Sequence, residues 1–249
     1  MYVCPITQRD LRGWRSPAGV TFPMWEGIPI LVPEPDALIA TAGEGGPPTE
    51  LLSPFLPPAM LGAPGRLGSW LVSELRTPAA VAAALGSRLA PPGPALDAGC
   101  GLAAVALSMA NRGRPTWAID TDPHILVCAR DILLGRVREA RLPGGPVMPL
   151  PLVPLRPSQV QLAVADVRAP PFRDGAFAWV HLGAPEGLAA AVRLLSPGGV
   201  LTCVTTDGLD DDRLNIVDEE EVVVVRPEGP RRFAVAVARC VAARKGPGG

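Results

Sequence analysis

The chain has few aromatic residues, little net charge and no long apolar run. Aromatic residues make up 4% of its 249 residues, and the formal net charge is −1, with a sequence pI of about 6.1. Tight nucleic-acid binding usually needs a basic surface and stacking aromatics, so we expect none here. No apolar run is long enough to span a bilayer, which argues against a membrane protein.

The cysteines exclude two further classes of protein. There are five, at positions 4, 100, 128, 203 and 240, and no two of them form a C-x-x-C pair. An odd number of scattered cysteines argues against a disulfide framework and against a zinc cluster, so we expect no metal. The N-terminal residues MYVCPITQRD show no signal-peptide pattern. The sequence therefore predicts a protein of a reducing, cytoplasmic compartment.

Proline and glycine are abundant and divide the chain into three parts. Residues 1–34 are expected to form a small unit, with short strands at 20–24 and 28–32. Residues 35–76 read as a linker with one short helix. Residues 77–249 are the main domain, in which the Pro-rich segment 136–158 is expected to be an insertion over one end of a sheet.

Strands and helices alternate from residue 95 onward. Strands are expected at 94–98, 115–120, 159–166, 176–182 and 200–205, with helices at 77–89, 102–111 and 188–195 and one that begins at Asp122. This alternation predicts an α/β fold with a doubly wound, Rossmann-like, mostly parallel sheet. EEVVVVRP and RRFAVAVARCVAAR flank EGP and predict a C-terminal antiparallel hairpin, and the N-terminal unit is a small β-rich extension.

A glycine loop follows the first strand, in ALDAGCGLAAVALSMANRG. Gly99 and Gly101 let the backbone turn tightly and approach a ligand, and the next helix offers free N–H groups at its start. Asp120 ends the second strand, where a carboxylate can accept from both ribose hydroxyls. The spacing also fits the G-x-G-x-x-G/A pattern, so this loop alone allows an NAD-dependent oxidoreductase.

Two further carboxylates favour another ligand. Asp97, two residues before Gly99, is unsuited to a pyrophosphate but suits the ammonium group of an amino acid. Asp166 ends a later strand, where it can accept from the amino group of adenine.

At these residues the chain resembles the class I S-adenosylmethionine-dependent methyltransferases. The matching stretches are LDAGCG, AIDTDPHILVCAR, VADVRAPPFRDGAFAWV and VRLLSPGGVLTCV, within residues 77–206. The resemblance implies that S-adenosylmethionine is the cofactor. It places the glycine loop on the methionine part, Asp120 on the ribose, and Asp166 with Val167 on the adenine. The residues expected at the cofactor are Asp97, Gly99, Cys100, Gly101, Asp120, Thr121, Asp166, Val167, His181 and Leu182.

His181 is the candidate catalytic residue. By the resemblance, it and Leu182 would face the sulfonium and the substrate. An imidazole titrates near neutrality and can take a proton from a nucleophile. The alternative is a polar residue that closes the pocket. His124, beside Asp122, is expected to be a simple helix-start residue.

Two departures from the family pattern keep a further interpretation open. Ala103 stands where the family often has a third glycine, and Ala178 stands where it often has an aspartate. A methyltransferase-like binding subunit without turnover is therefore the alternative outside enzymes.

The first residues carry a second resemblance. YVCPITQRDLRGW and GVTFPMWEGIPILV are similar to the small zinc-ribbon activator subunit of tRNA and release-factor methyltransferases. Here Cys4 stands alone and Ala18-Gly19 occupies the region of the second cysteine pair, so tetrahedral zinc is not supported. The unit is either a strand pair packed on the main domain or a platform for a protein partner or substrate.

The acceptor is expected to be a small molecule, with RNA or protein as alternatives. It would enter a pocket roofed by residues 136–158 and 206–215. The DGLDDD run in the second of these loops would favour neutral or cationic molecules.

Overall fold

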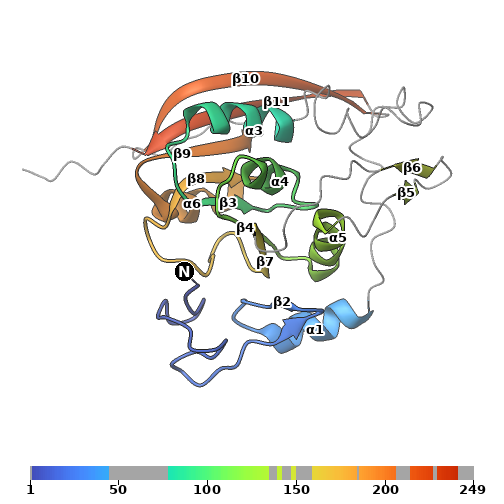
Figure 1. The fold of residues 1–249 in the computed structure, drawn as a ribbon, viewed down its shortest axis with the longest axis vertical. Helices are drawn as coiled ribbons and strands as arrows, with labels where there is room; N and C mark the ends of the chain where they lie inside the picture. The colour runs from blue at the N-terminus through green and yellow to red at the C-terminus, as the bar shows by residue number, and fades with distance from the viewer. Residues whose placement is uncertain are drawn as a thin grey trace, which may run out of the picture.

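The computed structural model describes residues 2–44, 78–134, 139–141, 147–149, 159–183, 185–205, 214–226 and 229–240. Its centre is a seven-stranded sheet in the order β10-β11-β9-β8-β3-β4-β7 (Figure 1). In chain order the strands are β3 (Ala95–Ala98), β4 (Thr116–Asp120), β7 (Val160–Val164), β8 (Phe177–Leu182), β9 (Leu195–Thr205), β10 (Leu214–Arg226) and β11 (Gly229–Cys240).

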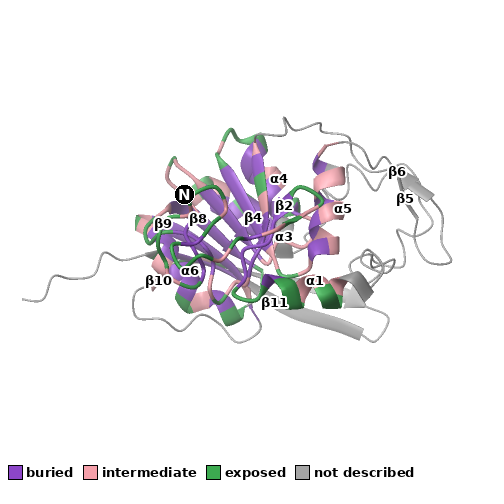
Figure 2. Cartoon of the chain, turned by 90° about the horizontal axis from the view of Figure 1, so that it is seen from below, coloured by how far each residue is buried: buried purple, intermediate pink, exposed green. Residues whose placement is uncertain are grey.

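Five of these strands, β7, β4, β3, β8 and β9, are parallel, and β11 and β10 extend β9 as an antiparallel hairpin. The central strands are buried on both faces, as expected for short apolar runs in a parallel sheet (Figure 2). The order of the strands reverses between β3 and β8, and the glycine loop leaves β3 at that point. The predicted α/β fold class and terminal hairpin are confirmed.

Three helices cover one face of the sheet: α3 (Pro78–Leu89), α4 (Ala104–Asn111) and α5 (Pro123–Leu133). The buried side chains of α3 and α4 pack on Ala95 of β3 and Trp179 of β8. Helix α5 packs with α4 on Ala118 of β4. Helix α5 begins where the sequence predicts, because Asp122 accepts the N–H groups of His124 and Ile125 at 2.8 and 3.3 Å. The short helix α6 (Leu188–Leu194) lies on the opposite face, after the 3₁₀ turn η4 (Pro185–Gly187).

The N-terminal unit completes that second face. Residues 165–176, between β7 and β8, contain turns and no helix. Cys4, Phe22 and Leu31 fill the space and share one apolar cluster with Leu96 of β3. The unit also prolongs the sheet past β7, since Leu31 N–H donates to the carbonyl of Val164 at 2.7 Å (Figure 1).

Two strands of two residues each lie near those predicted in this unit: β1 (Met24–Trp25) shares only Met24 with the predicted 20–24, and β2 (Ile28–Pro29) is shorter than the predicted 28–32. They pair around Glu26 and Gly27, whose φ angles of 47° and 86° make the two-residue turn of a tight hairpin.

The facing turns at Cys4 and Ser16 are joined by hydrogen bonds. Cys4 Sγ lies 3.1 Å from Ser16 Oγ, Thr7 N–H donates to Cys4 Sγ at 3.4 Å, and Ala18 N–H donates to Ser16 Oγ at 3.0 Å. Ser16, and not the Ala18-Gly19 pair singled out in the sequence, is therefore opposite Cys4. A thiol and a hydroxyl hold these turns by hydrogen bonds. Among the described residues, no group of His, Cys, Asp and Glu is arranged to hold a metal.

The linker and the insertion are described in part. The helix expected in the linker is α1 (Pro35–Glu44), and residues 45–77 lie outside the described part. Within the insertion, β5 (Glu139–Arg141) and β6 (Val147–Pro149) pair with each other in a sheet of their own. The sequence predicts the pocket roof at residues 136–158 and 206–215, and most of these lie outside the described residues. In the described part of the chain, no helix has the length and apolar character needed to cross a membrane.

Candidate cofactor site

The glycine loop has the conformation that its sequence requires. Gly99 and Gly101 have φ angles of 72° and 51°, a region that side chains disfavour. The N–H groups of Gly99 and Cys100 donate to the carbonyl of Ile119 in β4 at 2.9 and 3.0 Å, which fastens the loop to the neighbouring strand. Cys100 is partly buried between two apolar clusters, and desolvation raises the pKa of its thiol, so it is a small packed residue of the loop.

Ala103 adopts the glycine conformation without being glycine. Its φ is 60°, it is fully buried, and it is the N-cap of α4. The left-handed region costs an alanine about 1–2 kcal/mol. The methyl group packs with Ala106 and Ala118, so burial offsets part of that cost. The loop therefore keeps the geometry of a third glycine although the residue differs.

Asp97 lies beneath the loop and is 1% exposed. Its Oδ2 accepts the N–H of Ala106, in the first turn of α4, at 2.8 Å. Its Oδ1 is buried and has no hydrogen-bond partner among the described residues. Burial, helped by the charge of Asp120, raises the pKa of Asp97 to about 7. A buried carboxylate oxygen with no partner is costly and marks a place where a donor belongs.

Asp120, at the end of β4, faces the same loop. Its Oδ2 accepts the N–H of Gly101 at 3.0 Å, and its Oδ1 accepts the N–H of Asp122 at 3.1 Å. Each carboxylate oxygen has two acceptor positions, so one on each remains for a ligand hydroxyl. The neighbouring Thr121 is exposed.

Asp166 and Val167 follow β7 on the other side of β4. Asp166 forms an ion pair with Arg168 at 2.6 Å, and the guanidinium beside it lowers the pKa of the carboxyl. Val167 lies near Gly99, since a side chain placed on Gly99 would meet its Cγ1 at 3.8 Å. The ends of β3, β4 and β7 thus bring the predicted methionine, ribose and adenine residues to one edge of the sheet.

Gly183, directly after β8, was missed by the sequence reasoning. A Cβ at this position would lie 2.6 Å from the carbonyl oxygen of Gly99. The loops after β3 and β8 therefore touch through their backbones, which only a glycine permits. A glycine that directly follows an apolar strand is the signal that was available in the sequence.

His181 and Leu182 stand at the end of β8, and their side chains lie on opposite faces of the sheet. Leu182 is fully buried in the core cluster on the α6 face. His181 is 4% exposed on the opposite face, and its Nδ1 lies 3.2 Å from Thr202 Oγ1. Burial lowers the pKa of His181 to about 4. Its assignment as the catalytic base stays a prediction, as does the cofactor role of each residue named above.

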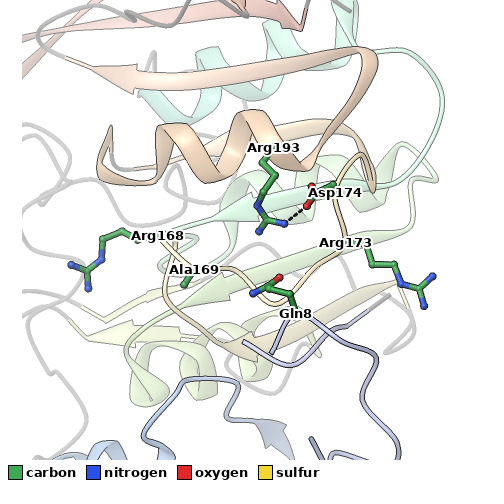
Figure 3. Close-up of a pocket in the computed structure, with 6 residues that line it drawn as sticks. All are labelled: Gln8, Arg168, Ala169, Arg173, Asp174 and Arg193. Carbon is green, nitrogen blue, oxygen red and sulfur yellow. Dashed lines mark hydrogen bonds and ion pairs between the residues drawn. The ribbon is translucent and has the colours of Figure 1, made fainter. Parts of the chain in front are cut away.

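Three other features of the chain bear on its function. His124 stands at the start of α5, as expected, and its Nε2 lies 2.9 Å from the carbonyl oxygen of Ala42 in α1. The acidic run at 206–213 lies outside the described residues. A hollow of about 620 Å³ beside the N-terminal unit is lined by Gln8, Arg168, Ala169, Arg173, Asp174 and Arg193 (Figure 3). Each of its arginines is already paired, with Asp166, Asp10 and Asp174 respectively.

No protein-family model and no curated protein matches the sequence. Solved structures do resemble it. A S-adenosylmethionine-dependent methyltransferase from Methanosarcina mazei is 15% identical, with 64% of this chain and 97% of that one covered and a TM-score of 0.47. TrmN from Thermus thermophilus is 22% identical, with 71% and 53% covered and a TM-score of 0.49. Geranyl diphosphate C-methyltransferase from Streptomyces coelicolor, solved with S-adenosyl-L-homocysteine, is 15% identical, with 84% and 98% covered and a TM-score of 0.49. These are likenesses of fold, and the strand order and terminal hairpin described above define the Rossmann-like fold of this chain.

Proposed function

We propose that this protein transfers a methyl group from S-adenosylmethionine to an acceptor. The observation that carries the proposal is Asp97 Oδ1, a buried carboxylate oxygen without a partner beneath the glycine loop. The α-ammonium group of the cofactor is a donor of the right charge for it. A dinucleotide would bring its pyrophosphate to the same loop, next to a carboxylate, and this repulsion disfavours the oxidoreductase.

The remaining predicted contacts fit the other parts of the cofactor. Asp120 has acceptor positions left for the two ribose hydroxyls. Asp166 and Val167 stand one strand further on, where the adenine would lie. When bound, the cofactor supplies a methyl group on a positively charged sulfur, ready for displacement by a nucleophile. The protein then has to hold the two reactants in line and exclude water.

His181 fits the role of a general base poorly in its present surroundings. A ring whose pKa is about 4 is neutral at neutral pH, but it accepts a proton weakly. Methyl transfer needs a base only if the nucleophile carries a proton that must leave. We therefore propose that positioning, rather than proton transfer by His181, is the main contribution of the chain.

The acceptor that we propose is a small neutral or cationic molecule, reaching the sheet at the carboxyl ends of its strands. The N-terminal unit is the surface for any protein partner. A cofactor-binding subunit without turnover is the second candidate. It is favoured by Ala178, which is 5% exposed in β8 where a family aspartate would stand.

The test of the proposal is calorimetry with S-adenosylhomocysteine. Asp120→Ala should weaken binding at least about tenfold, because hydrogen bonds to charged groups contribute about 1.5–3 kcal/mol each. Asp174→Ala is the matched control, since this exposed carboxylate pairs with Arg193 near the amino end of β8. Equal binding by all three proteins would remove Asp120 from the site. Binding of NAD in place of S-adenosylhomocysteine would overturn the proposal.

A further inference from the structure

A row of buried polar side chains crosses the sheet below the glycine loop. Asp97 of β3, His181 of β8 and Thr202 of β9 are partners in register in three neighbouring parallel strands. Partners in register project from the same face of a sheet, here the face covered by α3 and α4. Asp97, His181 and Thr202 are 1%, 4% and 0% exposed. Burying polar side chains in an apolar face costs free energy unless they are hydrogen-bonded, so each of the three is expected to have a hydrogen-bond partner.

At one end of the row, Thr202 contacts the His181 ring and favours one of its neutral forms. Trp179 Nε1–H donates to Thr202 Oγ1 at 3.0 Å, so the hydroxyl oxygen accepts and its own proton is left to donate. Nδ1 of His181 lies 3.2 Å from that oxygen. The ring is neutral at neutral pH, because burial lowers its pKa to about 4. Of the two neutral tautomers, the one in which Nδ1 accepts the Thr202 proton carries the ring proton on Nε2.

The other end of the row is Asp97. Its Oδ2 is used by α4, and its Oδ1 has no partner among the described residues. In the tautomer with the proton on Nε2, a donor, His181 Nε2–H, and an acceptor, Asp97 Oδ1, come from in-register neighbours at the carboxyl ends of β8 and β3. An α-amino acid carries the complementary pair on a single carbon, a carboxylate that accepts and an ammonium that donates.

We propose that His181 donates from Nε2 to the α-carboxylate of the bound cofactor while Asp97 accepts from its α-ammonium, so that together they recognise the amino-acid end. This inference rests on the proposed function and deepens it. His181 then contacts the cofactor as a neutral donor and not as a base. Thr202 and Trp179 are positioning residues that keep the ring in the donating form.

The test compares two ligands that differ in one group, S-adenosylhomocysteine and its decarboxylated form. His181→Phe should weaken S-adenosylhomocysteine about tenfold, the effect of losing a hydrogen bond to a charged group, and leave the decarboxylated ligand unchanged. Asp97→Asn should weaken both, since both keep the ammonium. His124→Phe, at the only other histidine, is the matched control and should change neither.

If His181→Phe does not fold, a second pair of variants, His181→Gln and His181→Asn, tests the same contact. The amide of glutamine reaches the place of Nε2, and the amide of asparagine reaches the place of Nδ1. His181→Gln should therefore retain binding of S-adenosylhomocysteine, and His181→Asn should lose it. If His181→Phe lost the same affinity for both ligands, or if the two amide variants bound equally, the role of His181 would be structural only. If the unaltered protein does not bind S-adenosylhomocysteine at all, both the proposed function and this inference fall.

A spectroscopic measurement tests the row separately from binding. Long-range ¹H–¹⁵N spectra of the free protein contain two histidine rings, and His124→Phe assigns them. The proton of His181 should be on Nε2, and Thr202→Val should change the ring spectrum. Thr116→Val, at a buried threonine near the amino end of β4, is the control and should not change it. A proton on Nδ1 in the unaltered protein would overturn the inference, whatever the binding results.

Discussion

Asp97 is the residue on which the chemistry of the site depends most. It is buried, half satisfied, and raised in pKa to about 7 from an ordinary value of 3.8. The folded protein therefore holds this proton between about pH 4 and 7, where the unfolded chain has already lost it. The Asp97 contribution to the free energy of unfolding therefore falls as the pH rises from about 4 to about 7, and it stays constant above that, where both states are ionised.

Cofactor affinity should show the opposite pH dependence. The α-ammonium group favours the ionised form of Asp97, so affinity for S-adenosylhomocysteine should rise from about pH 5 to about pH 8. Below about pH 7, binding should release a proton. Calorimetry in buffers with different heats of ionisation measures this release directly. His181 stays neutral throughout, because its pKa is about 4. Asp97→Asn should remove the dependence, and an unchanged pH profile in that variant would assign it to another group.

At the scale of elements, the site depends on the contact between the loops after β3 and β8. Gly183→Ala would place a methyl group 2.6 Å from the Gly99 carbonyl oxygen, and the two loops would have to separate. We expect a loss of about 1–3 kcal/mol in the free energy of unfolding, together with weaker binding of S-adenosylhomocysteine.

Gly199→Ala provides the comparison for this prediction. Its methyl group would meet the Ser196 carbonyl oxygen at 2.8 Å, in the turn within the first part of β9 at the other end of the sheet. Denaturation should show a similar loss of stability, whereas the affinity should not change. If both variants bind equally well, the contact between the loops is unimportant for the ligand.

The paired turns of the N-terminal unit give a second prediction at this scale. Ser16→Ala removes the partner of both Cys4 Sγ and Ala18 N–H, in a buried place, and should cost about 1–3 kcal/mol of stability. Ser87→Ala is the control, because that hydroxyl only bonds back to carbonyls of its own helix. Addition of a chelator should leave the melting temperature unchanged. A drop on chelation would show that a metal, rather than these hydrogen bonds, joins the turns.

At the scale of the whole molecule, the N-terminal unit and the sheet share one core. Leu31 is fully buried in the cluster that contains Leu96 and Phe172, and its N–H donates to Val164. Leu31→Ala should therefore destabilise the entire fold by about 2–5 kcal/mol, with a single unfolding transition by fluorescence and by circular dichroism.

The control for this prediction is Ile6→Ala, since Ile6 is 48% exposed and should contribute little. Two separate transitions, with only the first moved by Leu31→Ala, would mean that the unit folds independently. The domain boundaries drawn from the sequence stay a prediction until this is measured.

Local patterns in the sequence predicted most of the elements. Alternating apolar strands and helices predicted the parallel sheet, and EGP between two apolar runs predicted the hairpin of β10 and β11. Asp122 before Pro123 predicted the start of α5, because an N-cap acts on N–H groups two and three residues away. Such signals lie within a few residues of one another, so they can be read without the fold.

What only the tertiary structure decided are pairings between distant residues. Nothing near Thr202 in the sequence places it beside His181, because that contact depends on the register of β8 against β9. Gly183 is required by the backbone of Gly99, and Ser16 takes the place opposite Cys4 by the meeting of two turns. The N-terminal unit fills the face that a helix between β7 and β8 would otherwise cover. Register and packing depend on the whole core at once, and a short window of sequence does not contain them.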